Sequence, residues 1–124
     1  MIALFAMAAA SCSTKQSAPD QGNAAPASSA AAQEAHELYN TLCSACHGTS
    51  GKGDGVAAAS LQVKPRNYTD KAWQASVTDD QIKQVILGGG PAVGKSPLMP
   101  AQTQLASKPE VVDELVKIVR SFGQ

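Results

Sequence analysis

Apolar residues recur at intervals of three and four in three segments of the chain, the spacing of one face of an amphipathic helix. The segments span residues 33–46, 78–87 and 107–122. Their apolar positions are Ala35, Leu38, Tyr39 and Leu42 in the first, Ile82, Val85 and Ile86 in the second, and Leu115, Ile118, Val119 and Phe122 in the third. No segment shows the alternation of a strand, so the sequence predicts an all-α fold with three main helices.

Two of the predicted helices begin with residues typical of helix N-termini. Thr78 and Gln81 are in capping-box positions, and so are Ser107 and Glu110. Pro109 is compatible with the third helix because it lies in the first turn. Segments rich in Gly or Pro separate the helices and predict loops. They span residues 48–55, 65–70, 88–91 and 94–100.

The beginning of the chain has the composition of an export signal followed by a linker. Residues 1–10 form an apolar run that is too short to span a bilayer, and small residues lead from it into Cys12. We therefore expect residues 1–12 to be a lipoprotein-type signal with Cys12 as the lipidated residue. An ordinary signal peptidase site, which would release a soluble periplasmic protein, and an uncleaved anchor are the alternatives. Residues 13–33 are rich in Ala, Ser and Pro and predict a flexible linker, which leaves 34–124 as the folded domain.

Composition limits what this domain can be. Aromatic residues make up only 4% of the 124 residues, so the core is thin and a small domain of this kind needs something to supplement it. The ten basic and ten acidic residues cancel, and they form neither a basic stripe nor an acidic block. Nucleic acid is therefore not an expected partner.

Two cysteines and a histidine lie within five residues, in the motif Cys43-Ser44-Ala45-Cys46-His47. This spacing is typical of covalent haem c attachment, because positions i and i+3 share one face of a helical turn and both thiols can reach neighbouring vinyl groups. His47 can then bind the iron as the proximal ligand. A redox-active dithiol would need a βαβ context, and a zinc site would need a second ligand pair, whereas only Cys12 and His36 remain. The motif predicts one covalent haem c, whose attachment takes place after export.

Met99 is the predicted second axial ligand. It is the only methionine beyond the haem motif, and no histidine follows His47. A core role for Met99, an open or water-ligated iron, and ligation by His36 are the alternatives. We expect His36 to project into solvent from the first helix. Ligation by His47 and Met99 fills both axial positions, which favours electron transfer over catalysis.

Four motifs in this order resemble the class I cytochromes c, closest to the small bacterial monohaem proteins. They are Cys43 to His47, Gly51-Lys52-Gly53-Asp54-Gly55, Pro65-Arg66-Asn67-Tyr68 and Leu98-Met99-Pro100. The resemblance covers about residues 34–124 and implies a cytochrome c fold, in which three main helices and glycine-rich loops surround the haem. It also implies hydrogen bonds from Arg66, Tyr68 and Trp73 to the haem propionates. The alternative is that Arg66 and Tyr68 are exposed and Trp73 belongs to the core.

The resemblance further implies how the haem ligands are supported. A carbonyl at the position of Val56 is expected to accept the second N–H of His47. Tyr39 matches an aromatic residue that packs against the last helix, where its usual aromatic partner is replaced by Ile118, so an aliphatic helix crossing is expected. Three lysines can surround the haem edge and attract a redox partner, or simply be solvated. They are Lys52, Lys64 and Lys95.

The sequence thus predicts a monomeric single-electron carrier rather than an enzyme. Its low-spin haem c would exchange electrons with redox proteins of a respiratory or periplasmic chain, on the periplasmic side of a bacterial membrane to which a lipid anchors it. A fixed cytochrome subunit of a larger oxidoreductase, and a haem enzyme or gas-binding protein with a labile sixth ligand, are the alternatives.

Overall fold

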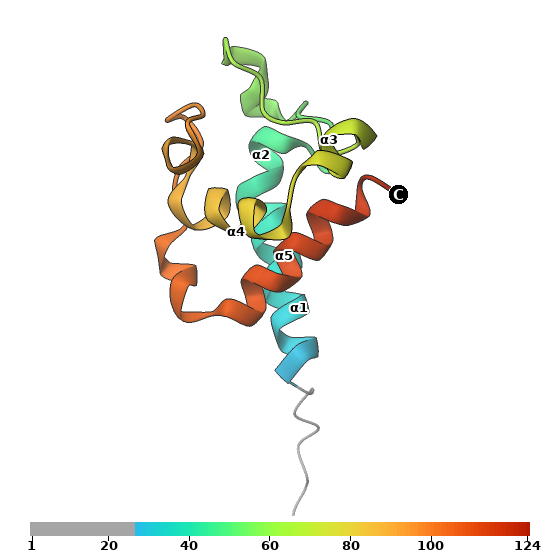
Figure 1. Cartoon of the computed structure of the whole chain (residues 1–124), viewed down its shortest axis with the longest axis vertical. Coiled ribbons are helices and arrows are strands. Elements are labelled where there is room, and N and C mark those ends of the chain that lie inside the picture. Colours follow the sequence, from blue (N-terminus) through green and yellow to red (C-terminus); the bar gives the residue numbers. More distant parts are fainter. Residues whose placement is uncertain (1–26) are drawn as a thin grey trace, which may run out of the picture.

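The computed structural model describes residues 27–124, which form helices, turns and loops without a strand (Figure 1). In chain order the elements are α1 (Ala27–Leu38), the π-helical turn η1 (Tyr39–Cys43), α2 (Ser44–His47), the 3₁₀ turn η2 (Val56–Ser60), α3 (Lys71–Ser76), α4 (Asp79–Gly88), the 3₁₀ turns η3 (Gly90–Val93) and η4 (Thr103–Ser107), and α5 (Pro109–Ser121). The all-α prediction is confirmed. The predicted export signal with Cys12, and the predicted linker up to residue 26, lie outside the described residues.

The core forms where α1 crosses α5 (Figure 1). Six residues of α5 are buried, as expected for a helix with a well-defined apolar face. They are Val111, Val112, Leu115, Val116, Ile118 and Val119. Ala31 and Ala35 are the buried residues of α1, and their small side chains allow the two helices to approach closely.

Tyr39 extends the core beyond α1, and its partner differs from the prediction. Its ring centroid lies 5.3 Å from that of Phe122, in a tilted arrangement that is favourable for aromatic pairs. The side chains buried where α1 crosses α5 are aliphatic, as expected, but the expected lack of an aromatic partner for Tyr39 is wrong. The aromatic partner of Tyr39 is Phe122 and not the residue at position 118. Phe122 follows α5 directly, and its backbone is still helical.

The first helix differs from its prediction at both ends. Within the described residues it spans Ala27–Leu38, and so it includes positions before residue 33 that were predicted to belong to the linker 13–33. Burial of Ala31 against the core explains why these positions are helical. The helix is also interrupted by η1, which contains Leu42, and there the side chain of Leu42 lines a cavity instead of packing on α5.

The helix starts follow the predicted signals in one case and not in the other. Thr78 caps α4 in a complete capping box, in which its Oγ1 accepts from Gln81 N and Gln81 Oε1 accepts from Thr78 N. The predicted box of Ser107 and Glu110 is wrong. Helix α5 begins after Lys108, and the Ser107 hydroxyl instead donates to the carbonyl of Gln104 to close η4.

Arg120 of α5 binds the chain from α3 to the start of α4 through several hydrogen bonds. Its Nη1 and Nη2 donate to the carbonyls of Gln74 and Val77, both at 2.7 Å, and its Nε donates to Asp79 Oδ1 at 2.8 Å. The Gln74 amide donates in turn to the carbonyls of Tyr68 and Val119, both at 2.8 Å. The segment from Tyr68 to the start of α4 is therefore held directly against the last helix.

Candidate functional site

A cavity of about 1000 Å³ brings together the residues that the motifs singled out. This volume lies at the upper end of the range for small-molecule and cofactor sites. All seven predicted haem-site residues line it, together with largely apolar neighbours. They are Cys43, Cys46, His47, Arg66, Tyr68, Trp73 and Met99. His36 is exposed and does not line the cavity, in agreement with its expected projection into solvent.

The two cysteines and His47 are presented by η1 and the single turn of α2. Both thiols are free and half-buried. The turn ends at Gly48, whose φ of 77° favours glycine and whose carbonyl accepts a hydrogen bond from the Tyr39 hydroxyl at 2.9 Å. The end of the motif is therefore anchored to the α1–α5 core through Tyr39.

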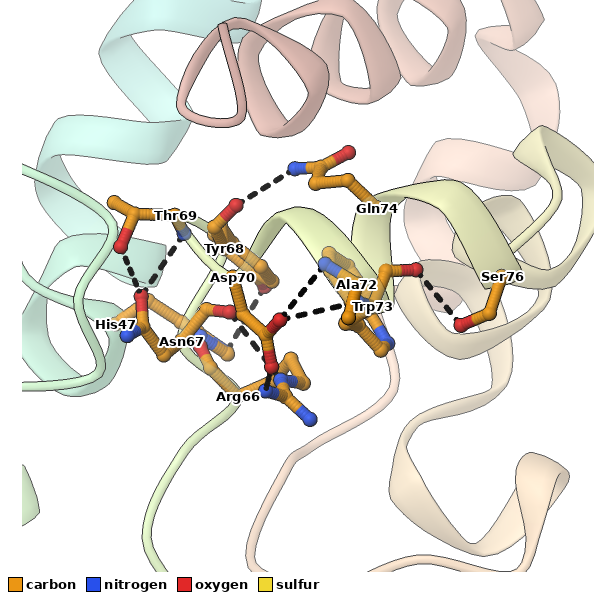
Figure 2. A network of polar contacts seen from close by, with 10 residues as sticks. All are labelled: His47, Arg66, Asn67, Tyr68, Thr69, Asp70, Ala72, Trp73, Gln74 and Ser76. Atoms are coloured by element: carbon orange, nitrogen blue, oxygen red, sulfur yellow. Dashed lines mark hydrogen bonds and ion pairs between the residues drawn. The ribbon is translucent and has the colours of Figure 1, made fainter.

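The imidazole of His47 is buried and engaged at both nitrogens (Figure 2). Its Nδ1 lies 3.1 Å from the carbonyl oxygen of Arg66, and since a carbonyl can only accept, Nδ1 carries a proton. In the neutral ring Nε2 then holds the lone pair, and the Tyr68 hydroxyl donates to it at 3.1 Å. The two rings are stacked, with centroids 4.5 Å apart.

The carbonyl partner of His47 differs from the prediction that named Val56. That residue begins η2, and its side chain is 91% exposed. Tyr68 N donates to the carbonyl of Gly51 at 2.7 Å, which draws the segment around Arg66 onto the glycine-rich loop. The carbonyl of Arg66 therefore reaches Nδ1. A hydrogen bond of this kind fixes the tautomer and orientation of metal-binding histidines.

Burial controls the protonation of the groups around the cavity. It lowers the pKa of His47, opposed by the hydrogen bond to the Arg66 carbonyl, and so favours the neutral ring that binds metals. Burial also raises the pKa of the Cys43 thiol, with a further contribution from Cys46. It raises the pKa of Tyr39 to about 12 and the pKa of Tyr68 as well, so both phenols remain protonated donors at neutral pH.

Met99 reaches the cavity from a segment that is fixed to the end of α4. Gly90 N donates to the carbonyl of Met99 at 3.0 Å, and Met99 N donates to the carbonyl of Ser96 at 3.3 Å. A Cβ at Gly90 would collide with the carbonyl oxygen of Ser96. The glycine that ended the predicted second helix thus permits the close backbone approach that positions Met99.

Arg66 and Trp73 both line the cavity and form one of its walls. Figure 2 shows the two side chains with their polar contacts. The Arg66 guanidinium lies 5.4 Å from the centroid of the Trp73 ring, a favourable cation–π distance, and pairs with the carboxylate of Asp70. Two lysines also line the cavity. Lys64 donates to the carbonyl of Ala58 at 2.8 Å, and Lys95 is exposed, whereas Lys52 is not among the lining residues.

Sequence reasoning missed two residues that organise this wall. Asn67 Oδ1 accepts from the backbone N–H and the hydroxyl of Thr69, which shapes the turn. Asp70 caps α3 by accepting from Ala72 N and Trp73 N. Asn67 is part of the Pro-Arg-Asn-Tyr motif, and an Asp directly before an apolar helical segment is a known start signal, so both were detectable.

Comparison with protein-family models matches residues 30–117 to the family described as cytochrome c oxidase, cbb3-type, subunit III. Comparisons with curated proteins and with solved structures give no match.

Proposed function

The chain belongs to the cytochrome family described as cbb3-type cytochrome c oxidase subunit III, and we propose that it is a single-electron carrier with His47 and Met99 as the axial ligands of its haem. Membership of this family makes it a c-type cytochrome that binds haem c covalently. The finer proposal concerns which residues hold the haem and what the protein does with it.

The observation that carries the proposal is the convergence of four residues on one cavity. Cys43, Cys46 and His47 come from η1 and α2, and Met99 comes from a segment about fifty positions later that follows α4. The donor set suits haem c, since two thiols can form thioethers and an imidazole and a thioether can bind iron. The orientation of His47 also fits, because a carbonyl holds Nδ1 and leaves the lone pair on Nε2, where iron would replace the Tyr68 hydroxyl.

Each part of the chain then has a separate role in the proposed carrier. Bound haem c supplies a one-electron Fe(III)/Fe(II) couple. The apolar lining excludes water, and the thioether of Met99 favours the reduced state relative to a second imidazole. Arg66, Tyr68 and Trp73 line the same cavity and are proposed to donate hydrogen bonds to the haem propionates, with Asp70 keeping the guanidinium in place.

Replacement of Met99 by Ala tests the proposal. We expect Met99→Ala to lose the low-spin haem spectrum, to bind carbon monoxide rapidly when reduced, and to lower the reduction potential by on the order of 0.1 V. Leu98→Ala is the matched control, because Leu98 adjoins Met99 and is 60% exposed. Optical spectra and potentiometry of both variants decide the matter. A Met99→Ala protein with wild-type spectrum and potential would contradict ligation by Met99.

We further propose that the carrier works on the periplasmic side of a bacterial membrane. A lipidated Cys12 would anchor it there, and the linker would join the folded domain to Cys12. The helices between residues 27 and 124 include none that is long and apolar enough to cross a membrane. Intact-mass spectrometry of the protein from its native membrane tests the anchor. A mass that starts at Cys12 and includes one haem and the lipid groups is expected, whereas a mature chain that starts elsewhere would exclude it.

The family description favours one second candidate, a fixed cytochrome subunit of a membrane oxidoreductase. Mild detergent extraction of native membranes distinguishes the two. A free carrier is expected to elute alone as a monomer, and a subunit is expected to elute with the larger complex at constant stoichiometry.

A further inference from the structure

The haem-binding motif is joined to α1 through a widened helical turn that the proposed function does not explain. In η1 the N–H of Ser44 donates to the carbonyl of Tyr39, five residues back, instead of to the carbonyl of Asn40, four residues back. A single turn of this kind inserts one extra residue into a helix, and such turns occur frequently at functional sites.

The extra residue changes the direction in which His47 points. Ala31, Ala35, Tyr39, Cys43 and His47 follow one another at intervals of four. In a regular α-helix such a row rotates by about 40° at each step, so His47 would lie about 160° around the axis from Ala31. One inserted residue turns the later part back by about 100°, to within about 60° of Ala31.

The burial pattern agrees with this rotation. Ala31 and Ala35 are buried against α5, and His47 is also buried, at 7% exposure. Leu42, which regular spacing would place beside Ala31 on the side that faces α5, lines the cavity instead. The widened turn therefore allows one continuous helical segment to pack on α5 and to present the motif to the cavity.

Two hydroxyl groups stabilise the widened turn. Ser44 Oγ donates to the carbonyl of Asn40 at 2.7 Å, and this is the carbonyl that the N–H of Ser44 would bond in an α-helix. Thr41 Oγ1 donates to the carbonyl of Glu37, also at 2.7 Å. Hydroxyl bonds to the carbonyl four residues back are known to distort helices, and here one comes from within the turn and the other from the residue that follows it.

We propose that Ser44, assisted by Thr41, is a positioning residue for the haem, because its hydroxyl sets the register between the α1–α5 packing face and the haem-binding motif. The inference rests on the proposed function, in which His47 is the proximal ligand. It assigns a role to the first variable position of the Cys-x-x-Cys-His motif in this chain. Without that hydroxyl the turn loses the bond that replaces its missing helical one, and the imidazole plane rotates relative to the haem.

The test uses the full-length, haem-loaded protein and four variants. Ser44→Ala and Thr41→Val remove the hydroxyl donors, and Ser44→Thr retains one. Ser60→Ala is the matched control, since Ser60 makes a similar hydroxyl–carbonyl bond, at 3.1 Å, in η2. The readouts are the fraction of chains with covalent haem, by intact mass, and the shifted haem methyl resonances of the ferric protein in proton NMR, which report the orientation of the axial imidazole.

We expect Ser44→Ala and Thr41→Val to alter the methyl shift pattern and to lower the haem-loaded fraction, with melting temperatures reduced by roughly 4–8 °C. Ser44→Thr should restore the wild-type pattern, and Ser60→Ala should keep it. A lower melting temperature with an unchanged shift pattern in both Ser44→Ala and Thr41→Val would overturn the proposal. It would also be overturned if these two variants behaved like the control Ser60→Ala in every readout. A wild-type protein without haem on Cys43 and Cys46 would instead refute the proposed function.

Discussion

Asp70 connects three parts of the cavity wall through one carboxylate. Its Oδ1 accepts from Ala72 N at 3.0 Å and from Trp73 N at 3.1 Å, and its Oδ2 pairs with the guanidinium of Arg66. Asp70 thereby fixes the start of α3, the helix that carries Trp73, and the side chain of Arg66. Both neighbours are proposed propionate donors, so the charge of Asp70 matters to the site as well as to the fold.

This charge makes the stability of the wall depend on pH. The hydrogen bond from Trp73 N is the largest of the interactions that lower the pKa of Asp70 below its ordinary value of 3.8, and the Arg66 charge adds to it. A depressed carboxyl pKa stabilises the folded state above the ordinary value, and that contribution is lost as the pH falls through the folded-state pKa. We expect Asp70→Ala to lower the melting temperature at pH 7 and to lower it less at acidic pH.

Asp70→Asn is the matched comparison, because asparagine retains the cap without the charge. We expect its melting temperature to stay closer to that of the wild type, while the pH dependence assigned to Asp70 disappears. Thermal unfolding of the three proteins between pH 2 and pH 7 is the measurement. An equal deficit of Asp70→Ala at every pH would contradict a contribution from the ionised carboxylate.

At the residue scale the sequence predicts most where chemistry is local. The spacing of Cys43, Cys46 and His47 predicts the haem attachment site, and Met99 is the predicted second ligand because no other methionine or histidine follows the motif. The carbonyl that orients His47 could not be found in this way. It belongs to Arg66 rather than Val56, because a hydrogen bond between Tyr68 and Gly51 brings together segments that are distant in sequence.

At the scale of elements, α3 is held in place by α5 rather than by its own length. With the six residues Lys71–Ser76 it is too short to be stable alone, and Arg120 supplies the connection. The guanidinium donates to the carbonyls of Gln74 and Val77 and to the carboxylate of Asp79, while its side chain is only 28% exposed. Removing the guanidinium would leave the part-buried carbonyls of Gln74 and Val77 without this hydrogen-bond donor.

We expect Arg120→Met, which retains the apolar stem, to reduce the free energy of unfolding by roughly 2–4 kcal/mol. Lys117→Met is the control on the same helix, because the side chain of Lys117, which pairs with Glu114, is 70% exposed, so the pair should contribute within about 1 kcal/mol. Chemical denaturation of the haem-loaded protein measures both. Similar losses in the two variants would show that the contacts of Arg120 with the α3 segment add little.

Element boundaries depended on tertiary contacts that local pattern does not contain. The capping box of α4 was predictable because Thr78 and Gln81 satisfy each other within one turn. The presence of α1 before residue 33 depends on the packing of Ala31 in the α1–α5 core. The interruption at η1 is linked to the burial of His47 after the turn. A periodicity of three and four cannot reveal one inserted residue, so it could not show that Leu42 lines the cavity instead of packing on α5.

At the scale of the whole molecule, two parts of the domain differ in how much their packing depends on the haem. Most buried side chains of the α1–α5 crossing pack against other protein side chains, and Leu115 and Val119 of α5 also line the cavity. The segments that carry Arg66 and Met99 instead face mainly the cavity of about 1000 Å³, where the haem of the proposed function would supply packing partners for their apolar side chains. The haem should therefore stabilise these segments far more than it stabilises the crossing helices.

Removal of the haem tests this division. In the double variant Cys43→Ala, Cys46→Ala, which cannot attach haem c, we expect helical far-UV circular dichroism to persist, near-UV signals to weaken, and a hydrophobic dye to bind. Hydrogen exchange should localise the effect. Amides of α1 and α5 should retain most of their protection, whereas those of residues 61–68 and 90–100 should exchange rapidly. Uniform loss of protection would mean that the crossing helices also need the haem, and uniform retention would mean that the cavity is stable on protein contacts alone.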